Sequence, residues 1–434
     1  MRVHLIGSEG VSMKWIADRL RFRGKEVSGS DITLGGHNAE NVKGADLVVY
    51  TSAIKEDNPE LVAARAAGIP CIARAEFLGN IAAEFDETIA VAGTHGKTTV
   101  TAMLAEILKS RSPAVHIGGT IGGRRGNAVG DGLFIAEACE YRRAFCHINP
   151  DIAVVLNVEL DHTDFYKNYG EVLSAFAEFV SHAETAVIPD SLSDVLIPKA
   201  GGRQVCVGTR GSWALLDCRR KTEGTELLFK TPDGLREFFT PLHGRHNATD
   251  ALFAVAAARE SGADYGEIAT ALAEFRGADR RMQYVGRMKG IPVYSDYAHH
   301  PTEIKATLEG LYCAGYSRPL VAFQPHTYAR LNSLFEGFAE ALGKTDSVIL
   351  PVFNARGKAE GKGSEALSEI LGAKNFSSAA KNFEEAARII KSRAAFCDAV
   401  VVMGAGDNEK LIPLICDKIY KCCVKFNRKR AKFL

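Results

Sequence analysis

The stretch TIAVAGTHGKTTV, residues 88–100, decides the fold of this chain. Its apolar first part, 88–92, predicts a buried strand, and the residues from Val100 onward predict a helix with its apolar side chains on one face. The glycine-rich loop 93–99 lies between them. Such a loop is typical of phosphate binding, because its backbone N–H groups and the helix N-terminus both attract an anion.

Two side chains of this loop carry the expected chemistry. Lys97 is placed to reach the β- and γ-phosphates of a nucleotide, and the Thr98 hydroxyl to bind Mg²⁺. The full phosphate-loop motif has a glycine at position 91, where this chain has Val91, so the loop is a shortened form, GxxGKT. The alternative is a chance glycine-rich turn, which the agreement of strand, loop, Lys-Thr pair and helix disfavours.

The length and the pattern of elements predict an α/β protein of several domains. At roughly 150 residues per domain, 434 residues correspond to about three domains. Strand and helix patterns alternate, so we expect three doubly wound or related α/β units, at 1–86, 87–283 and 284–434. The hydrophobic fraction of 46% and the charged fraction of 24% exclude a mostly disordered chain.

Charge and cysteine usage exclude further classes of protein. The 53 Lys and Arg against 52 Asp and Glu give a net charge of +1, which argues against nucleic-acid binding through bulk charge. No signal peptide or membrane-spanning apolar stretch is evident, so we expect a cytoplasmic protein without membrane insertion. The ten cysteines lack CxxC spacing and predict reduced, packed thiols. The basic segment 418–434 is expected to be a solvated helix end.

Polar residues follow two of the predicted strands. Glu137 ends one strand, and Asn157 ends the next, with His162 shortly after it. Open α/β sheets bind ligands at the carboxyl ends of their strands, so a carboxylate and an imidazole there could hold one or two Mg²⁺ near a γ-phosphate. Each residue taken alone is more often a surface or capping group, and the phosphate loop favours the metal-site interpretation.

The N-terminal stretch HLIGSEGVSM, residues 4–13, is a degraded dinucleotide fingerprint. Glu9 and Ser12 stand where the motif favours glycine. The fingerprint by itself would suggest a nucleotide-binding dehydrogenase, but that function leaves the loop 93–99 without a purpose.

Four polar segments lie beside apolar ones, and each is equally compatible with a binding site and with a structural turn. They are GRHNATD at 244–250, the pair Arg280-Arg281, DYAHHPTE at 296–303 and FQPHTYAR at 323–330. Convergence of His299, His300, His326 and Arg330 would suit an anionic substrate.

Taken together and in this order, these segments resemble the Mur ligase family. The matching motifs are GTHGKTT, EACEYRRAF, NVELDHTDFY, GRHN, the arginine pair, DYAHHPTE and FQPHTYAR, with SGSD at 28–31, Gly36-His37 and TSAIKEDNPE at 51–60 in the N-terminal part. They span nearly the whole chain, so the resemblance is specific.

The resemblance implies three domains and a reaction. The N-terminal domain is implied to be Rossmann-like and to bind a UDP-sugar, the central one to be a phosphate-loop ATPase-like domain, and the C-terminal one to be Rossmann-like and to bind an amino acid. The implied substrates are ATP, UDP-N-acetylmuramate and L-alanine, with Mg²⁺ as cofactor. The lactyl carboxylate is implied to attack the γ-phosphate, and the amine to attack the resulting acyl phosphate, giving an amide, ADP and phosphate. We expect a monomer or a weak homodimer.

The resemblance also implies roles for particular residues. The nucleotide is implied to contact Gly93, Thr94, His95, Gly96, Lys97, Thr98 and Thr99 with its phosphates, His246, Asn247 and Asp250 with its adenine, and Arg281 and Asp296 across two domains. Mg²⁺ is implied to bind Thr98 and Glu137, and a second ion His162. The UDP part is implied to lie against Gly7, Ser30, Asp31, His37 and Ser52, and the acyl and amino-acid region against His299, His326 and Arg330. The implied catalytic set is Lys97, Glu137, His162, Arg281 and Asp296.

Two departures from the family pattern leave alternatives open. Glu9 places a carboxylate where a diphosphate is expected, and Asp250 replaces an asparagine. A sister ligase that adds another amino acid or a recycled peptide is one alternative. A dehydrogenase and a catalytically inactive binding protein are the others, and the intact Lys97, Thr98, Glu137 and His162 argue against the last.

Overall fold

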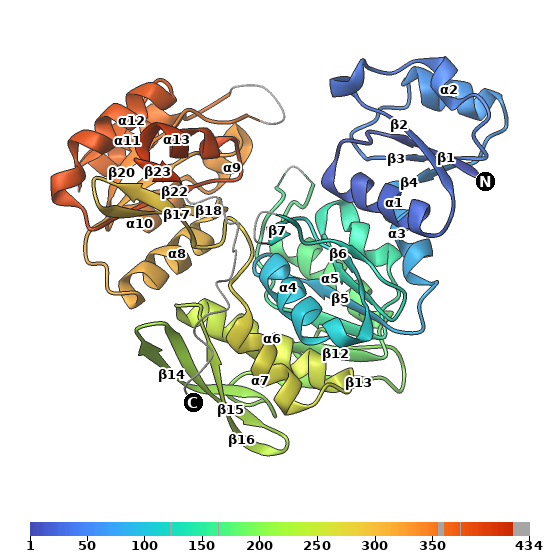
Figure 1. Ribbon diagram of the computed structural model, residues 1–434, viewed down its shortest axis with the longest axis horizontal. Coiled ribbons are helices and arrows are strands. Elements are labelled where there is room, and N and C mark those ends of the chain that lie inside the picture. The colour runs from blue at the N-terminus through green and yellow to red at the C-terminus, as the bar shows by residue number, and fades with distance from the viewer. Residues whose placement is uncertain (122–123, 164, 355–359, 374, 420–434) are drawn as a thin grey trace, which may run out of the picture. The chain divides into compact units, whose positions relative to one another are not determined.

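The computed structural model describes residues 1–121, 124–163, 165–354, 360–373 and 375–419. These residues form two compact units, and the predicted α/β class is confirmed (Figure 1). The first unit contains residues 1–119, 126–241 and 247–275, and the second contains 120–125, 242–246 and the chain from 276 onward. Most of the basic tail, with Cys422 and Cys423, lies outside the described residues.

The N-terminal part of the first unit is a parallel four-stranded sheet in the order β2-β1-β3-β4. Its elements are β1 (Arg2–Ile6), α1 (Val11–Phe22), β2 (Glu26–Ser30), β3 (Leu47–Tyr50), α2 (Pro59–Ala66), β4 (Cys71–Ala73) and α3 (Arg74–Ala82). The register places Ile6 between Ser30 and Tyr50, so the carboxyl ends of three strands meet at one edge. Gly7, Asp31 and the turn at Thr51 follow at that edge.

The middle part of the first unit is a seven-stranded sheet in the order β13-β12-β11-β5-β10-β6-β9, parallel except for β9. Its strands are β5 (Thr88–Ala92), β6 (Ala114–His116), β9 (Ala128–Val129), β10 (Phe134–Glu137), β11 (Ile152–Val155), β12 (Thr185–Pro189) and β13 (Arg203–Val207). Its helices are α4 (Lys97–Ile107), α5 (Tyr169–Ser181), α6 (Arg245–Glu260) and α7 (Tyr265–Glu274). The strand β5 and helix α4 confirm the elements predicted around the loop 93–96.

An antiparallel three-stranded sheet, β14 (Ala214–Lys221), β15 (Gly224–Thr231) and β16 (Gly234–Thr240), follows the middle sheet in the chain. The turn between β15 and β16 is Thr231-Pro-Asp-Gly234, a sequence typical of a tight turn. One hydrophobic core joins the N-terminal and middle parts, because Trp15 of α1 stacks on Phe134 of β10 with ring centroids 5.5 Å apart. The indole N–H of Trp15 donates to the carbonyl of Ala128 at 2.8 Å.

The second unit is built on a seven-stranded sheet in the order β21-β20-β19-β22-β18-β17-β23. Buried side chains of this unit form two hydrophobic cores of their own. Its strands are β17 (Gln283–Met288), β18 (Ile291–Asp296), β19 (Pro319–Phe323), β20 (Asp346–Ile349), β21 (Ser377–Ala379), β22 (Ala399–Met403) and β23 (Lys418–Ile419). Its helices are α8 (Pro301–Cys313), α9 (Tyr328–Ser333), α10 (Phe335–Leu342), α11 (Ser364–Gly372), α12 (Phe383–Ser392) and α13 (Ile412–Ile415).

One sequence-based expectation about this unit is wrong. The pattern Leu331, Leu334, Phe335, Phe338, Leu342 predicts a single helix, but α9 and α10 are separated at Leu334, whose φ of −117° is not helical. Asn332 and Ser333 explain the break. Their side chains donate to the carbonyls of Tyr328 and Arg330, and such bonds compete with the helix ladder.

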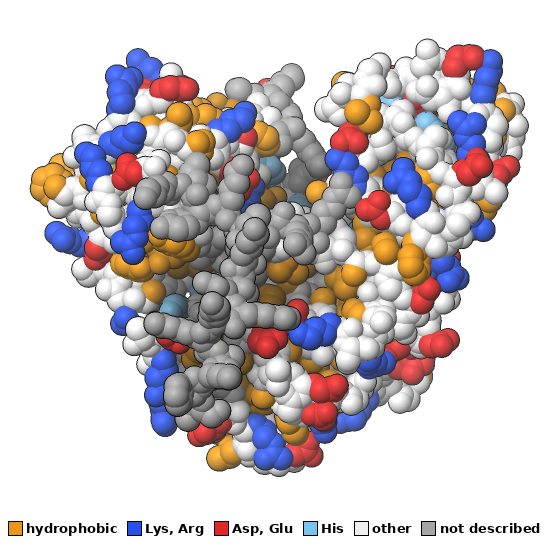
Figure 2. All heavy atoms as spheres, viewed as in Figure 1, with side chains coloured by type: hydrophobic (Ala, Val, Ile, Leu, Met, Phe, Trp, Pro, Cys, Tyr) orange, Lys and Arg blue, Asp and Glu red, His pale blue; other side chains and the backbone are white. Residues whose placement is uncertain are grey.

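The surface agrees with the charge balance of the sequence. On the face that Figure 2 shows, basic and acidic side chains are interspersed rather than gathered by sign. Within the described ranges, the helices are all too short or too polar to cross a lipid bilayer. The eight cysteines among the described residues are free thiols. Seven of them are partly buried, but Cys139 is exposed, so the prediction of a packed side chain is wrong there.

Candidate active site

The loop after β5 needs its two glycines. Gly93 and Gly96 have φ values of +147° and +85°, where side chains are strained. A Cβ atom on Gly96 would lie 2.7 Å from Oδ1 of Asp250, so there is also no room for one. Asp250, the residue implied to lie near adenine, is therefore packed against the loop.

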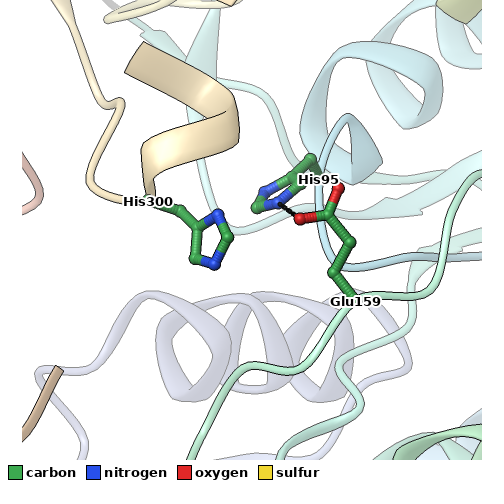
Figure 3. Close-up of side chains that lie close together, drawn as sticks. All are labelled: His95, Glu159 and His300. Atoms are coloured by element: carbon green, nitrogen blue, oxygen red, sulfur yellow. Dashed lines mark ion pairs between the residues drawn. The ribbon is translucent and has the colours of Figure 1, made fainter. Parts of the chain in front are cut away.

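The segment after β11 holds the loop from the other side. Asn157 Oδ1 accepts from the His95 N–H at 2.9 Å, and its Nδ2 donates to the His95 carbonyl at 3.1 Å. The Glu159 N–H donates to Thr94 Oγ1 at 2.8 Å, and the Glu159 carboxylate lies 3.5 Å from His95 Nε2 (Figure 3). Side chains of one strand end thus fix the backbone of the neighbouring loop.

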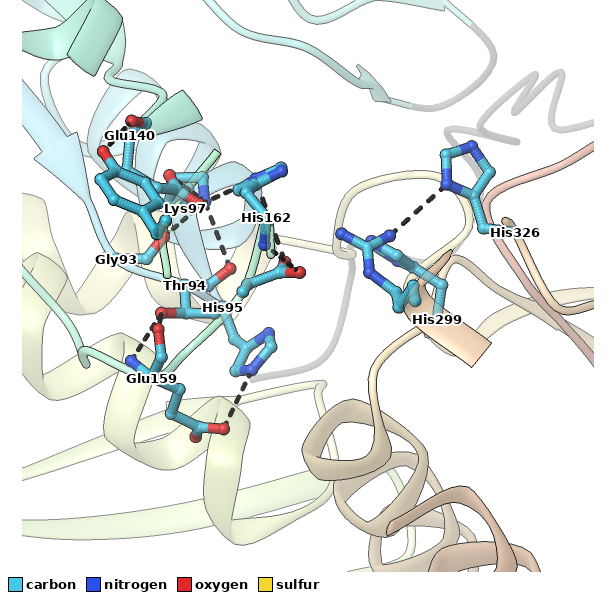
Figure 4. A network of polar contacts seen from close by, with 12 residues as sticks. Gly93, Thr94, His95, Lys97, Glu140, Glu159, His162, His299 and His326 are labelled. Carbon is cyan, nitrogen blue, oxygen red and sulfur yellow. Dashed lines mark hydrogen bonds and ion pairs between the residues drawn. The ribbon is translucent and has the colours of Figure 1, made fainter. Parts of the chain in front are cut away.

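Lys97 forms a buried ion pair with Glu140. Its ammonium lies 2.9 Å from Glu140 Oε2, and it also donates to the carbonyls of Gly93 and Thr94 (Figure 4). Burial alone would lower the pKa of Lys97, but the adjacent Glu140 carboxylate outweighs it and raises the pKa. Burial likewise favours a raised pKa for Glu140, yet Lys97 and His162 hold it below its ordinary value. Both groups are therefore charged.

Thr98 and Glu137 are brought together, as expected for shared metal ligands. The Thr98 hydroxyl donates to Glu137 Oε1 at 2.9 Å, and Glu137 Oε2 accepts from the Gly118 N–H at 2.8 Å. A hydroxyl and a carboxylate are oxygen donors of the kind that Mg²⁺ prefers, so the residues present fit that ion.

His162 lies at the edge of the same group. Its Nε2 is 3.4 Å from Glu140 Oε1, and its ring packs on Tyr141 with centroids 4.8 Å apart. Its φ of +50° is unusual for a residue with a side chain and marks a backbone held by its surroundings. Lys97, Thr98, Glu137 and His162 all lie at the carboxyl edge of the middle sheet. Figure 4 shows Lys97 and His162 beside Glu140.

Sequence reasoning missed Glu140. The signal was present, because EACE places a second carboxylate three residues after Glu137. In the structure this residue is 3% exposed, and the phenol of Tyr166 donates to its backbone carbonyl at 2.6 Å.

The N-terminal candidates form a second cluster at the carboxyl edge of the four-stranded sheet. Gly7 has a φ of +84°, and its N–H donates to the Ser30 carbonyl at 2.8 Å. Asp31 accepts from the Glu9 N–H at 3.2 Å, and Ser52 is exposed in the turn after β3. The Glu9 carboxylate that seemed to oppose a diphosphate is paired with Lys14 at 2.5 Å.

Ser30 and His37 of this cluster share a partner that the sequence did not reveal, Glu60. Glu60 is fully buried at the start of α2, in the NPE of the TSAIKEDNPE motif.

In the helix α6, Asn247 is buried and belongs to the first unit with Asp250, whereas His246 belongs to the second. Burial, reinforced by the charge of Arg281, lowers the pKa of His246 to about 4. His246 is thus a neutral ring.

In the second unit, Asp296 ends β18 and is buried, and burial raises its pKa. Its oxygens accept from the N–H groups of Met282 and Ala298, each at 2.8 Å. Arg281 lies 3.4 Å from Glu303 Oε1, and its guanidinium lies over the Tyr297 ring.

The structure brings His299, His326 and Arg330 together at the ends of β18 and β19. The His299 and His326 rings are 6.0 Å apart, and Arg330 donates to His326 Nδ1 at 3.4 Å. Glu303 Oε2 accepts from the His299 N–H at 2.9 Å. Three of the four residues predicted to converge, His299, His326 and Arg330, therefore lie together within the second unit. The fourth, His300, caps α8, where its Nδ1 accepts from the Thr302 N–H at 3.3 Å.

The middle sheet has a phosphate loop with a buried lysine, and the other α/β sheets have polar residues at their strand ends. These features define a nucleotide-binding α/β protein. Three family models match successive parts of the chain. The Mur ligase family catalytic domain matches residues 2–86, the Mur ligase middle domain 91–258, and the Mur ligase glutamate ligase domain 280–406. The chain belongs to the Mur ligase family, and it is a ligase of three α/β domains.

Relatives and solved structures agree with this assignment. The chain is 36% identical to the UDP-N-acetylmuramate--L-alanine ligases of Agathobacter rectalis and Acetivibrio thermocellus, over 94% of its length and 96% and 94% of theirs. It is similar to the crystal structure of the UDP-N-acetylmuramate-alanine ligase of Thermotoga maritima, with a TM-score of 0.79 and 27% identity over 95% of this chain and 98% of that one.

Proposed function

We propose that this chain joins L-alanine to the lactyl carboxylate of UDP-N-acetylmuramate at the expense of ATP, as a cytoplasmic step of peptidoglycan precursor synthesis. The observation that carries the proposal is the Lys97, Thr98 and Glu137 constellation in a chain that aligns over 94% of its length with relatives of that name. The carboxylate attacks the γ-phosphate to form an acyl phosphate, and ADP leaves. The amine of L-alanine then displaces phosphate from the acyl phosphate and loses a proton to form the amide.

In this proposal the middle domain reduces the electrostatic repulsion between two anions, the lactyl carboxylate and the γ-phosphate. Lys97 carries a fixed positive charge that the γ-phosphate meets, and the N–H groups of the first turn of α4, residues 97–99, bind the phosphate oxygens. Thr98 and Glu137, which are hydrogen-bonded to each other, would hold Mg²⁺, and His162 would hold a second ion. Bound Mg²⁺ supplies charge neutralisation at the transferring phosphoryl group.

The remaining candidates bind the other substrate groups. We assign the UDP part to Gly7, Ser30, Asp31, His37 and Ser52, the adenine to His246, Asn247 and Asp250, and the acyl and amino-acid region to His299, His326 and Arg330. Arg281 and Asp296 contact ATP. We assign the UDP-sugar to segment 1–86, ATP to segment 87–283 and the amino acid to segment 284–434. Because residues 276–283 belong to the second compact unit, we place the last boundary a few residues before 283.

A sister ligase is the second candidate function. The structure is also similar to the UDP-N-acetylmuramate:L-alanyl-gamma-D-glutamyl-meso-diaminopimelate ligase of Neisseria meningitides, with 27% identity and a TM-score of 0.57 over 64% of this chain and 99% of that one. That likeness favours a peptide as the alternative acceptor.

Phosphate release decides between these functions. The protein is mixed with ATP, Mg²⁺ and UDP-N-acetylmuramate. Separate reactions also contain L-alanine, glycine, L-serine or the tripeptide L-alanyl-gamma-D-glutamyl-meso-diaminopimelate. We expect release with L-alanine at the highest kcat/KM. Preference for the tripeptide would replace the first function by the second, and no release with any acceptor would exclude both.

The lysine of the loop is tested in the same assay. Lys97→Ala is expected to lower turnover by about a hundredfold or more, because the transferring phosphate loses its fixed charge. Lys109→Ala, which removes an exposed lysine just after α4, is the matched control and should keep wild-type turnover. Retained turnover in Lys97→Ala, with a wild-type circular dichroism spectrum, would remove the phosphate-loop assignment.

A further inference from the structure

Glu60 is a buried carboxylate that the proposed mechanism does not use. Its side chain is 0% exposed, and it lies in the first turn of α2, where Asn58 caps the helix. A buried ionised group is costly unless hydrogen bonds satisfy it. Most of its donors come from one stretch of chain, 30–41, which follows β2 and contains the candidate UDP residues.

Both carboxylate oxygens of Glu60 are occupied by donors. Oε1 accepts from the Asn38 N–H at 3.1 Å and from Asn41 Nδ2 at 2.5 Å, and Oε2 accepts from the Ser30 hydroxyl at 2.5 Å. Burial alone would raise the pKa of Glu60, but the hydrogen bonds from Ser30 and Asn41 outweigh it and lower the pKa. Glu60 is therefore an ionised acceptor.

These contacts decide which nitrogen of His37 carries a proton. His37 Nδ1 lies 3.3 Å from Glu60 Oε2 and 3.4 Å from Ser30 Oγ. The only hydroxyl proton of Ser30 is directed to Glu60, so both neighbours of Nδ1 present lone pairs. A bare Nδ1 would face two acceptors. In the neutral ring the proton therefore sits on Nδ1, and Nε2 carries the lone pair.

A second histidine touches the same carboxylate without changing this conclusion. His4 Nε2 lies 3.5 Å from Glu60 Oε2, and its Nδ1 is 2.9 Å from Ser28 Oγ. His4 is 1% exposed, and burial lowers its pKa, so it is a neutral packing partner. The His37 side chain is 19% exposed, so of the two rings it is the one that solvent or a ligand can meet.

We propose that Glu60 is a positioning residue of the UDP-sugar site, which fixes the Nδ1–H tautomer of His37 so that Nε2 accepts a hydrogen bond from an N–H or O–H group of the UDP-sugar. The inference rests on the proposed function for the identity of the ligand. Glu60 does not touch the ligand, and it acts by orienting the His37 ring and the loop 30–41.

Glu60→Gln tests the inference, because the new amide can donate an N–H to His37 Nδ1 where the carboxylate could only accept. The proton of His37 should then move to Nε2, and the ring would offer a donor where the ligand needs an acceptor. We expect the KM for UDP-N-acetylmuramate to rise about tenfold, the loss of roughly one hydrogen bond, with kcat and the KM for ATP within about twofold of wild type. Glu56→Gln, at an exposed position before the same helix, is the matched control and should change none of these constants.

Nitrogen-15 NMR of the imidazole rings reads the tautomer directly, with the His37 signals assigned by their loss in His37→Ala. The wild-type protein should show the proton on Nδ1, and Glu60→Gln should show it on Nε2. A purely structural role would not move this signature. A wild-type ring protonated on Nε2 would overturn the inference even if Glu60→Gln failed to fold.

A coupled variant and two nucleotides complete the test. In the His37→Ala background, Glu60→Gln should add little to the KM for the UDP-sugar, and a full additional tenfold would overturn the inference. If wild type binds UDP more tightly than CDP, and His37→Ala does not, the donor to His37 is the imide N–H of uracil. If wild type binds UDP and CDP equally well, the donor is a hydroxyl. Equal affinity for UDP-N-acetylmuramate in wild type and His37→Ala would overturn the inference.

Failure of the proposed function is distinguishable from failure of this inference. A wild-type protein without turnover on UDP-N-acetylmuramate contradicts the function, whereas normal turnover with an unchanged KM in a folded Glu60→Gln contradicts only the role of Glu60.

Discussion

Lys97 and Glu140 place opposite charges in contact beneath the phosphate loop, with side chains 14% and 4% exposed. Removing one member of a buried pair leaves the other without compensation, which costs far more than losing a surface pair. The pair thus keeps the lysine charged in a desolvated place, where its charge acts most strongly on a phosphate.

The stability of the chain without nucleotide should reflect this pair. Glu140→Gln is expected to lower the unfolding free energy by roughly 3 kcal/mol, since the Lys97 charge loses its partner. The double variant Lys97→Met with Glu140→Gln should lose less than the sum of the single variants. Urea unfolding of the four proteins measures the coupling.

The exposed pair between Arg143 and Glu178 provides the comparison for that cycle. Its side chains are 40% and 44% exposed, at a distance of 3.0 Å. Glu178→Gln should change the unfolding free energy by less than about 1 kcal/mol. Additive effects of the Lys97 and Glu140 substitutions would show that the buried pair contributes no coupling.

At this scale the sequence predicts contacts that follow from strand order. Thr98 and Glu137 meet because Glu137 ends β10 and Thr98 lies in the helix that follows the adjacent strand β5, and both strand ends could be read from apolar runs. Glu140 and Glu60 could not be found in this way. Their roles depend on burial and on donors that lie up to 43 and 30 residues away, which no local pattern records.

Among the elements, the strands were the most predictable. The runs 2–6, 88–92, 319–323 and 399–403 are the strands β1, β5, β19 and β22, because short, mostly apolar runs in an alternating strand–helix pattern fit a buried parallel strand. The break between α9 and α10 was not predicted, since apolar spacing continues through it. Side-chain bonds of Asn332 and Ser333 to backbone carbonyls decide it.

The N-terminus of α2 allows a prediction about a single element. Asn58 caps this helix by accepting from the N–H groups of Glu60 and Leu61, at 3.0 and 3.3 Å. Asn58→Ala should lower the unfolding free energy by about 1 kcal/mol, and Asn58→Asp, which keeps the acceptor, should restore most of it. Thermal unfolding measures both, and equal losses would show that the cap is not the stabilising contact.

For the whole molecule, length and composition predicted three domains, and the family models agree with that number. They did not predict that the first two share a core. Trp15 stacks on Phe134, and Arg19, 2% exposed, donates to the Gly130 carbonyl at 2.8 Å and pairs with Asp131 at 2.7 Å. An amphipathic helix such as α1 shows which face is buried, but its sequence does not show which sheet covers that face.

Ser12 and His116 join the same two domains by a hydrogen bond. Ser12 Oγ lies 2.7 Å from His116 Nε2, and Arg74 donates to Ser12 at 3.1 Å. His116 is 6% exposed, and burial, with the charge of Arg74, lowers its pKa to about 3. Ser12, which breaks the glycine fingerprint, is therefore a contact between domains.

This lowered pKa predicts how the first unit responds to acid. An unfolded histidine takes up a proton near pH 6.5, whereas folded His116 resists it down to about pH 3, so the stability that neutral His116 provides is complete above pH 6.5 and is lost as the pH falls below it. His116→Gln removes this proton uptake while keeping a polar partner for Ser12. Between pH 7.5 and 4.5 the variant should lose roughly 2 kcal/mol less unfolding free energy than wild type.

Tryptophan fluorescence during urea unfolding measures that difference, because both tryptophans, Trp15 and Trp213, lie in the first unit. His147→Gln, at an exposed position of the same unit, controls for the loss of a histidine as such. If His116→Gln and wild type lose the same stability over this range, a neutral His116 is not what ties the N-terminal domain to the middle domain. The acid sensitivity of the first unit would then have to come from its paired carboxylates, of which Arg19 holds Asp131 and Glu84 at the same domain junction.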